Sequence, residues 1–324
     1  MIKKSGRFLA VLMIIAFMPV LAQGAESKKT MVQICGATSG GTYFLLANAI
    51  AQVLNSKLPD DFKANAQSTA GTPVNIRLME KKEADFAFGQ AGVAKSALDG
   101  VGGFEQKFTN IASVTYVYPN VMHIAVPKDA NIKTFADFKG KSFAVGASGS
   151  ATELNSRDMA KVYGLDYLAK KEFTPEFASE AQSVELLKNR QAIGANLIAG
   201  VGAASVMELM SSGKFELLDF ADDKITELNK LNMAYFKYVI PANTYPNQPK
   251  PNSTFAVANY IFCRKDLPED LVYKFTKALY DYQADLVAVH KAASQIKKEN
   301  AINGLTVPLH PGAEKYFKEI GAIK

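Results

Sequence analysis

Two loops rich in glycine, serine and threonine have the composition of an anion-binding site. One joins an apolar run at 32–35 to a stretch of helical periodicity at 43–58, and the other joins 142–145 to 151–163. The first N–H groups of a helix carry about half a positive charge together, and small side chains let an anion approach them. These loops predict binding of a small anion.

The elements predicted around the loops alternate between strands and helices. Strands at 31–35, 64–67 and 86–88 alternate with helices at 43–58 and after Thr72, which we expect to cap its helix with Pro73 in the first position. A similar order recurs between residues 142 and 198. Alternation of this kind predicts an α/β fold with a parallel sheet, and ligands bind beyond the carboxyl ends of such strands.

The second loop repeats the chemistry of the first, since Thr38–Thr42 is echoed by Ser148–Thr152. The echo predicts two similar lobes with their loops on one cleft. Two extended runs at 113–118 and 121–126, interrupted by Pro119 and Asn120, and a further one at 233–240, followed by a proline-rich stretch, predict two chain crossings between the lobes. The predicted division is a signal peptide at 1–24, a discontinuous lobe I at 25–117 and 241–324, and lobe II at 118–240. A predicted helix at 268–288 closes lobe I.

The N-terminus has the layout of a secretory signal peptide. Lys3, Lys4 and Arg7 precede an uncharged apolar run at 8–20, followed by small residues suited to cleavage. We therefore expect export to the periplasm. The formal net charge is +6, and removal of these three cations leaves +3, with basic and acidic residues interspersed. This pattern argues against nucleic-acid binding.

An enzyme is the competing interpretation. A periplasmic hydrolase could use a serine of the loop at 146–150, but its fifth residue is serine where a nucleophile elbow requires glycine. His123, His290 and His310 lie far apart in the sequence, so we predict no catalytic triad, no metal site and no cofactor. We expect His123 in a crossing strand and the other two at the surface or near a terminus.

Cys35 and Cys263 both lie in predicted buried strands. A disulfide requires these strands to be neighbours, because the two Cα atoms must lie within about 7 Å. Two unbridged buried thiols are the favoured interpretation, and the bridge stays open at this point.

Several short motifs, in order along the chain, resemble the TAXI family, the solute-binding proteins of tripartite ATP-independent (TRAP) transporters. Each motif is common, but the ordered set spans almost the whole mature chain. The motifs are Ser39–Tyr43, Gln67–Gly71 with Asn75, Asp85–Gln90, Phe138–Lys141 leading to Gly146–Ser150, and His310–Ala313.

The resemblance implies a type II periplasmic binding protein, in which two α/β lobes joined by hinge strands hold a ligand in the cleft between them. It implies an organic acid or amino acid such as glutamate, glutamine or 2-oxoglutarate, delivered to the integral membrane subunits of a TRAP transporter for uptake driven by an ion gradient. A monomer suits such a receptor.

The resemblance also implies a set of ligand-binding residues. By position, Ser39, Gly40, Gly41, Thr42 and Tyr43 would hold a carboxylate, Ser68, Asn75 and Gln90 would add polar contacts beside it, and Ser148, Gly149, Ser150, Thr152 and Asn196 would contact the ligand from the second lobe. Asn196 stands where relatives often carry aspartate, and Ala151 where glycine is usual. Arg157 and Arg190 fall on predicted helices, so we expect them in solvent rather than in the cleft. The departures leave the ligand's identity open.

Overall fold

The computed structural model describes residues 2, 29–232 and 234–324. The predicted signal peptide at 1–24 lies outside these residues except for Ile2. Within the described part of the chain, no helix is both long enough and apolar enough to cross a membrane.

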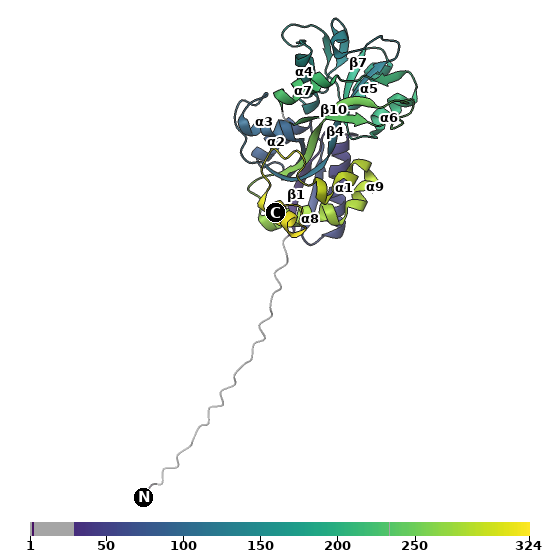
Figure 1. The fold of residues 1–324 in the computed structure, drawn as a ribbon. Coiled ribbons are helices and arrows are strands. Elements are labelled where there is room, and N and C mark those ends of the chain that lie inside the picture. Colours follow the sequence, from purple (N-terminus) through teal and green to yellow (C-terminus); the bar gives the residue numbers. More distant parts are fainter. Residues whose placement is uncertain (1, 3–28, 233) are drawn as a thin grey trace.

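The first lobe combines the N-terminal segment with the C-terminal one. In Figure 1 it is the lower half, coloured purple and yellow. Its elements are β1 (Thr30–Cys35), α1 (Thr42–Lys57), β2 (Phe62–Gln67), α2 (Thr72–Glu80), β3 (Phe86–Gln90), α3 (Ala91–Asp99), α8 (Glu269–Asp281), α9 (Gln283–Val289), the 3₁₀ helices η2 (Lys291–Gln295) and η3 (Lys298–Asn300), and α10 (Pro311–Glu319).

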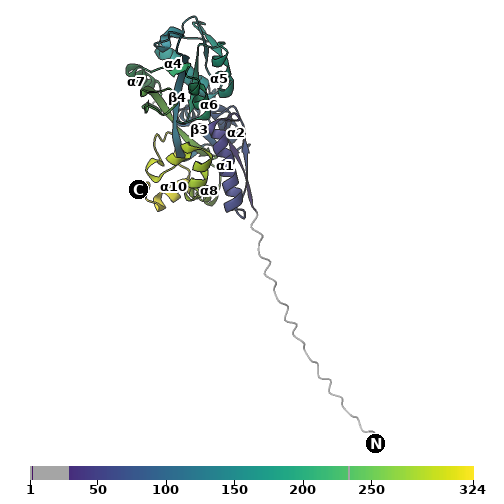
Figure 2. The same cartoon turned by 90° about the vertical axis from the view of Figure 1, so that its right-hand side faces the viewer.

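The second lobe is built from the middle of the chain, coloured teal and green in the upper half of both views (Figures 1 and 2). Its elements are the 3₁₀ helix η1 (Phe135–Phe138), β5 (Ser142–Ala144), α4 (Ala151–Val162), β6 (Thr174–Glu176), α5 (Glu180–Lys188), β7 (Gly194–Ala199), α6 (Ala204–Ser211), β8 (Phe215–Leu217), α7 (Asp222–Leu231) and β9 (Tyr235–Ile240).

Two long strands, β4 (Ala112–Pro127) and β10 (Asn252–Cys263), pass through both lobes and pair antiparallel with each other. The strand order is β2-β1-β3-β10-β4-β7-β5-β6, with β8 beside β4 and β9 beside β10. The prediction of a parallel sheet was therefore wrong for the sheet as a whole. Strands β1, β2 and β3 of the first lobe and β5, β6 and β7 of the second pair in parallel, but every pairing with β4 or β10, including those of β8 and β9, is antiparallel.

Two predicted element boundaries change in the structure. The segment at 113–126 is one strand rather than two runs, because Pro119 and Asn120 pair with β10 beyond a register shift that accommodates the irregularity. The predicted helix at 268–288 is broken at Tyr282, where the backbone leaves the helical region. The break turns α9 back toward α1, which it contacts.

Each lobe has its own apolar core. In the first, the rings of Phe86 on β3 and Phe275 on α8 stack with their centroids 3.7 Å apart. In the second, Phe135, Phe138 and Phe143 cluster between η1 and β5, with centroid distances between 4.6 and 5.2 Å. Separate cores allow each lobe to behave as a unit on either side of the crossing strands.

The two cysteines are buried and unbridged. Strand β3 lies between β1, which carries Cys35, and β10, which carries Cys263, so the two strands are not neighbours. Burial raises the pKa of Cys35 to about 11. Both thiols are buried and unbridged, which is the favoured interpretation of the sequence. The sheet order produces this outcome because it keeps the two strands apart.

One histidine prediction was wrong in part. His310 is buried rather than at the surface, because its Nδ1 accepts a hydrogen bond from the Gly312 N–H at the start of α10 while its Nε2 donates to the Leu267 carbonyl. His123 lies in β4 as predicted and is fully buried. His290 is half-buried beside the cleft described below.

Candidate functional site

A cleft lies between the two lobes and is lined by both. The space between its walls, including the open mouth, is about 710 Å³. The first lobe contributes Ala37, Thr38, Gly41, Thr42, Tyr43, Ala70, Gly71, Thr72 and Gln90, strand β4 contributes Tyr118 and Asn120, and the second lobe contributes Gly146, Ala147, Ser150, Ala151, Thr152, Ala178, Ser179, Glu180, Ser183, Asn196 and Ile198.

Five helices begin at this cleft. The residues that precede α1 to α5, namely Gly41, Gly71, Gln90, Ser150 and Ser179, all belong to its lining. The first N–H groups of a helix have no partner within the helix, and they form the positive end of the helix dipole. The cleft therefore offers N–H donors and positive potential from backbone groups.

The helix starts differ between the two walls. In the second lobe, the Ser150 hydroxyl accepts from the Glu153 N–H at 3.2 Å, and Ser179 forms a reciprocal capping box with Gln182. In the first lobe, α1, α2 and α3 begin without any side-chain cap. The predicted cap by Thr72 was wrong, because its hydroxyl accepts from the Gln90 N–H instead. The first lobe thus leaves its helix starts available to an anion.

The two loops make the same turn, although not in the predicted alignment. The Gly41 N–H donates to the Thr38 carbonyl at 3.1 Å, and the Ser150 N–H donates to the Ala147 carbonyl at 3.0 Å. Thr38 therefore corresponds to Ala147 rather than to Ser148. The reason is that Ser150 must occupy the cap position, where its hydroxyl can reach the first turn of α4.

Seven of the thirteen predicted residues line the cleft and six do not. Those in the lining are Gly41, Thr42, Tyr43, Gln90, Ser150, Thr152 and Asn196. Those outside it are Ser39, Gly40, Ser68, Asn75, Ser148 and Gly149. Gly40 and Gly149 have φ angles of +86° and +68° and lie at exposed tips of the two loops, so their role is to make the turns.

Asn75 is buried behind the cleft and holds its wall together. Its Nδ2 donates to the carbonyls of Gly36 and Phe88, both at 2.8 Å, and its Oδ1 accepts from the Thr69 hydroxyl at 2.7 Å. These bonds join the ends of β1 and β3 to the loop before α2. All of its side-chain polar atoms are engaged within the protein.

Three buried amide side chains in the lining have an oxygen without a partner: Gln90, Asn120 and Asn196. The orientation of Asn196 follows from its neighbours. The Ser156 hydroxyl donates to the Val145 carbonyl, so it must accept from Asn196 Nδ2, which leaves the Asn196 Oδ1 as a free acceptor. A buried acceptor without a partner costs about 1–3 kcal/mol, so these oxygens favour a ligand with hydrogen-bond donors.

A histidine orients one hydroxyl of the lining. His290 Nδ1 accepts from the Ala292 N–H, so in the neutral ring Nε2 carries the proton and donates to the Thr42 hydroxyl at 3.3 Å. Burial lowers the pKa of His290, which favours that neutral form. The Thr42 side chain is also in hydrogen-bonding contact with the Tyr118 hydroxyl, which lines the same cleft.

Two tyrosines form an aromatic part of the wall. The rings of Tyr43 and Tyr118 meet edge to face with centroids 6.2 Å apart, and Tyr43 also stacks on Phe88. The Tyr43 hydroxyl donates to Asn259 Oδ1 on β10, so its polar end is already engaged. This bond ties α1 to the crossing strand.

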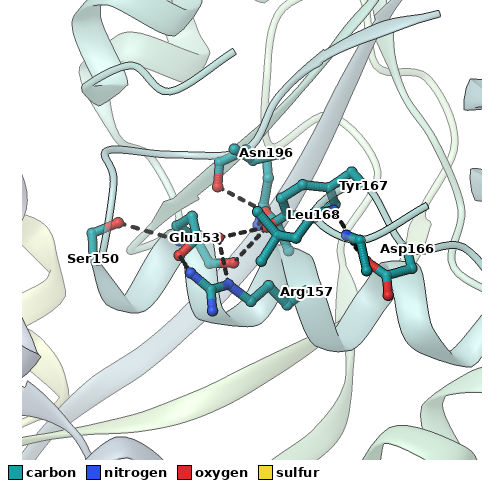
Figure 3. A network of polar contacts seen from close by, with 10 residues as sticks. Ser150, Glu153, Arg157, Asp166, Tyr167, Leu168 and Asn196 are labelled. Carbon is teal, nitrogen blue, oxygen red and sulfur yellow. Dashed lines mark hydrogen bonds and ion pairs between the residues drawn. The ribbon is translucent and has the colours of Figure 1, made fainter. Parts of the chain in front are cut away.

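A polar network braces the opposite wall (Figure 3). The buried carboxylate of Glu153 receives two hydrogen bonds from Arg157, at 2.5 and 2.6 Å, and one from the Tyr167 hydroxyl at 2.7 Å. Arg157 is about half exposed, as expected, and points away from the cleft lining. The network fixes the first turn of α4, to which Ser150 is bonded.

Glu180 is the acidic residue of the cleft, and the sequence analysis missed it. It is the first residue of α5. Among the described residues that line the cleft, it is the only carboxylate, and none is lysine, arginine or histidine. Burial raises its pKa, opposed by a hydrogen bond from Ser205. The pair Ser179-Glu180 is an ordinary helix start in sequence, so only the fold reveals its position.

The loop proposed for a hydrolase does not present a serine with a base. Ser148 is exposed outside the lining, and the Ser150 hydroxyl caps α4. The described lining contains no histidine that could take a proton from Ser150. The geometry therefore favours binding over nucleophilic catalysis.

Replacement of Asn75 should loosen the first-lobe wall. We expect Asn75→Ala to lower the free energy of unfolding by about 2–4 kcal/mol, because two buried carbonyls lose their donor. Asn75→Asp should cost more, because it places an oxygen against both carbonyls. Denaturant unfolding would measure both, with Asn48→Ala as a control, since Asn48 donates only to the Phe44 carbonyl one turn back on α1. Equal stability of the Asn75→Asp variant and the native protein would contradict this assignment.

Solved structures of similar fold include several solute-binding proteins. Three have a TM-score of 0.51: the periplasmic aliphatic sulphonate binding protein SsuA from Escherichia coli, at 13% identity over 89% of this chain and 82% of that one; the ligand binding component of an ABC-type import system from Staphylococcus aureus, with zinc bound, at 13% over 90% and 99%; and PhnD1 from Prochlorococcus marinus in complex with methylphosphonate, at 11% over 90% and 99%. At these identities the likeness shows the fold, two α/β lobes of the periplasmic binding protein type.

The sequence comparison covers nearly all of the described chain. Residues 34–321 match the NMT1-like family, a span that runs from the end of β1 to beyond α10 and includes every segment of the cleft. This protein belongs to the NMT1-like family.

Proposed function

We propose that this protein is an exported solute-binding receptor that captures a small organic acid or acidic amino acid in the cleft between its lobes. The observation that carries the proposal is the convergence of five helix starts on one cleft, three of them without a side-chain cap. Unpaired N–H groups at a helix start bind carboxylates, sulfonates and phosphonates alike. The solved relatives of similar fold include proteins whose names refer to sulphonate and methylphosphonate, which supports a ligand with an anionic group.

The resemblance of the loop motifs to those of the TAXI family supports a carboxylate ligand of the glutamate, glutamine or 2-oxoglutarate class. In this proposal the helix starts of the first lobe hold the carboxylate, with Gly41, Thr42 and Gln90 beside it. Ser150, Thr152 and Asn196 contact the ligand from the second lobe. The six predicted residues outside the lining shape the loops or lie at their exposed tips.

Ligand capture proceeds by closure of the lobes about β4 and β10, with lobe I at 25–117 and 241–324 and lobe II at 118–240. Closure is favoured only as far as the ligand binds the closed form more tightly than the open one. A ligand that contacts both walls meets this condition, because it gains its second set of contacts only when the lobes approach.

A thermal-shift screen of purified protein against small organic acids and amino acids tests the receptor function. A ligand at 100 times its Kd adds about 2.7 kcal/mol to the stability of the protein, so the melting temperature of the protein should rise by several degrees. Sugars and uncharged amides of similar size serve as controls. Absence of a shift with every carboxylate, sulfonate and phosphonate would reject the proposal.

A charge placed at the start of α1 should separate binding from stability. We expect Thr42→Asp to keep or raise the melting temperature of the free protein, because a carboxylate in the first turn suits the helix dipole, and to weaken acid binding about tenfold or more. Thr42→Asn is the matched control, with the same shape and no charge. Isothermal titration calorimetry measures the affinities. Equal affinity of the aspartate and asparagine variants would place the anion elsewhere.

We propose that the receptor serves a TRAP transporter as a periplasmic monomer. The ordered motifs shared with the TAXI family support this choice, although one solved structure of similar fold belongs to an ABC-type import system. Uptake of radiolabelled ligand into vesicles with the cognate membrane subunits should follow an imposed ion gradient without ATP. Uptake that requires ATP and ignores the gradient would assign the receptor to the other class.

A further inference from the structure

The two walls of the cleft differ in the hydrogen-bonding groups that they present. The first-lobe wall offers donors, since the starts of α1, α2 and α3 have no side-chain cap. In the second lobe the starts of α4 and α5 are already capped by Ser150 and Ser179. The second-lobe wall presents two acceptors, the unpartnered Oδ1 of Asn196 and the carboxylate of Glu180, one oxygen of which accepts from Ser205. On the first-lobe wall the unpartnered acceptor is Gln90 Oε1. An anion suits the first wall and a donor suits the second.

Glu180 has no cationic partner among the described residues. Its carboxylate accepts a hydrogen bond from the Ser205 hydroxyl on α6. The other charged residues of α5 and α6 are Glu185, Lys188 and Glu208, and Lys188 pairs with both carboxylates. The ionisable groups that face it from β4 and from the segment before β10 are the phenols of Tyr118 and Tyr245, both buried, neutral and without positive charge.

A half-buried carboxylate in an anion-binding cleft needs a compensating group. An ionised carboxylate without a partner is costly in a region of low dielectric constant, and it would also repel the ligand's own anionic group. A ligand ammonium group removes both costs, because it pairs with Glu180 and satisfies Asn196 in the same region. An oxo group in its place would set a further acceptor against two acceptors.

We propose, on the basis of the proposed receptor function, that Glu180 is the residue that selects the ligand class: it binds a protonated amine, so the cleft prefers α-amino acids over the oxo acids of the same carbon skeleton. The carboxylate of the amino acid lies at the first-lobe helix starts and its ammonium group faces Glu180 and Asn196. The polarity of the ligand thus matches the polarity of the cleft.

The matched probes are glutamate with 2-oxoglutarate, and alanine with pyruvate, which differ within each pair only in the amino or oxo group. We expect native protein, freed of carried-over ligand by unfolding and refolding, to prefer the amino acid of a pair. Glu180→Gln should weaken amino-acid binding about tenfold or more and leave oxo-acid binding unchanged or stronger. Glu185→Gln is the control, an exposed carboxylate on the same helix that pairs with Lys188.

The dependence on pH supplies a second measurement. The ammonium group of the ligand stabilises the ionised form of Glu180. The affinity for amino acids should therefore fall as the pH is lowered through the pKa of Glu180 in the ligand-free protein, which burial raises. Glu180→Gln should remove this fall. A protonated Glu180 that donates to an anion would produce the opposite trend, with affinity rising at low pH.

Three results would overturn the inference. One is stronger binding of the oxo acid by the native protein, and another is the same preference in the native and Glu180→Gln proteins; both leave the receptor function intact. The third is binding of none of the four acids while sulfonates or phosphonates bind. If the native protein binds no anion at all, the proposed receptor function fails as well. Binding measurements on the native protein alone therefore distinguish failure of this inference from failure of the receptor function.

Discussion

The antiparallel pairing of β4 with β10 is the constraint on which the rest of the structure depends. Both strands run through the two lobes, and each pairs on its other side with strands of one lobe or the other. The pairing places the helix starts that follow β1, β3 and β5 on the same cleft. Most apolar contacts lie within one lobe or the other, although Ala151 at the start of α4 packs into a first-lobe cluster. Movement of the lobes about the crossing strands keeps the backbone hydrogen bonds of the crossing.

In the proposed function, the cleft binds anions through backbone groups rather than through basic side chains, of which its described lining has none. A helix start offers oriented N–H donors that are held in place by the helix, so little ordering is required when a ligand binds. Support for these donors comes from residues behind the wall, such as Asn75 on one side and Glu153 on the other. Such a cleft accepts many acids, and discrimination must come from the few side chains that differ between its walls. In this protein the distinctive one is Glu180.

The solved relatives of similar fold show how widely this architecture is used, since their names refer to sulphonate and methylphosphonate ligands. The likeness to them shows a shared fold of two α/β lobes. The chemistry of the ligand depends instead on the polar residues at a few positions. In this chain those positions combine three uncapped helix starts with an amide and a carboxylate.

The sequence by itself determined the local features. Apolar periodicity located most helices and strands, and the glycine and serine pattern located both loops, because turn and helix-start preferences depend on neighbouring residues. The tertiary structure alone decided which polar groups share the cleft. It turned Asn75 inward, set β3 between the two cysteines, shifted the alignment of the second loop by one residue and brought Glu180 opposite the helix starts of the first lobe. These outcomes depend on contacts between residues far apart in the chain, for which the pattern of a single sequence carries no signal.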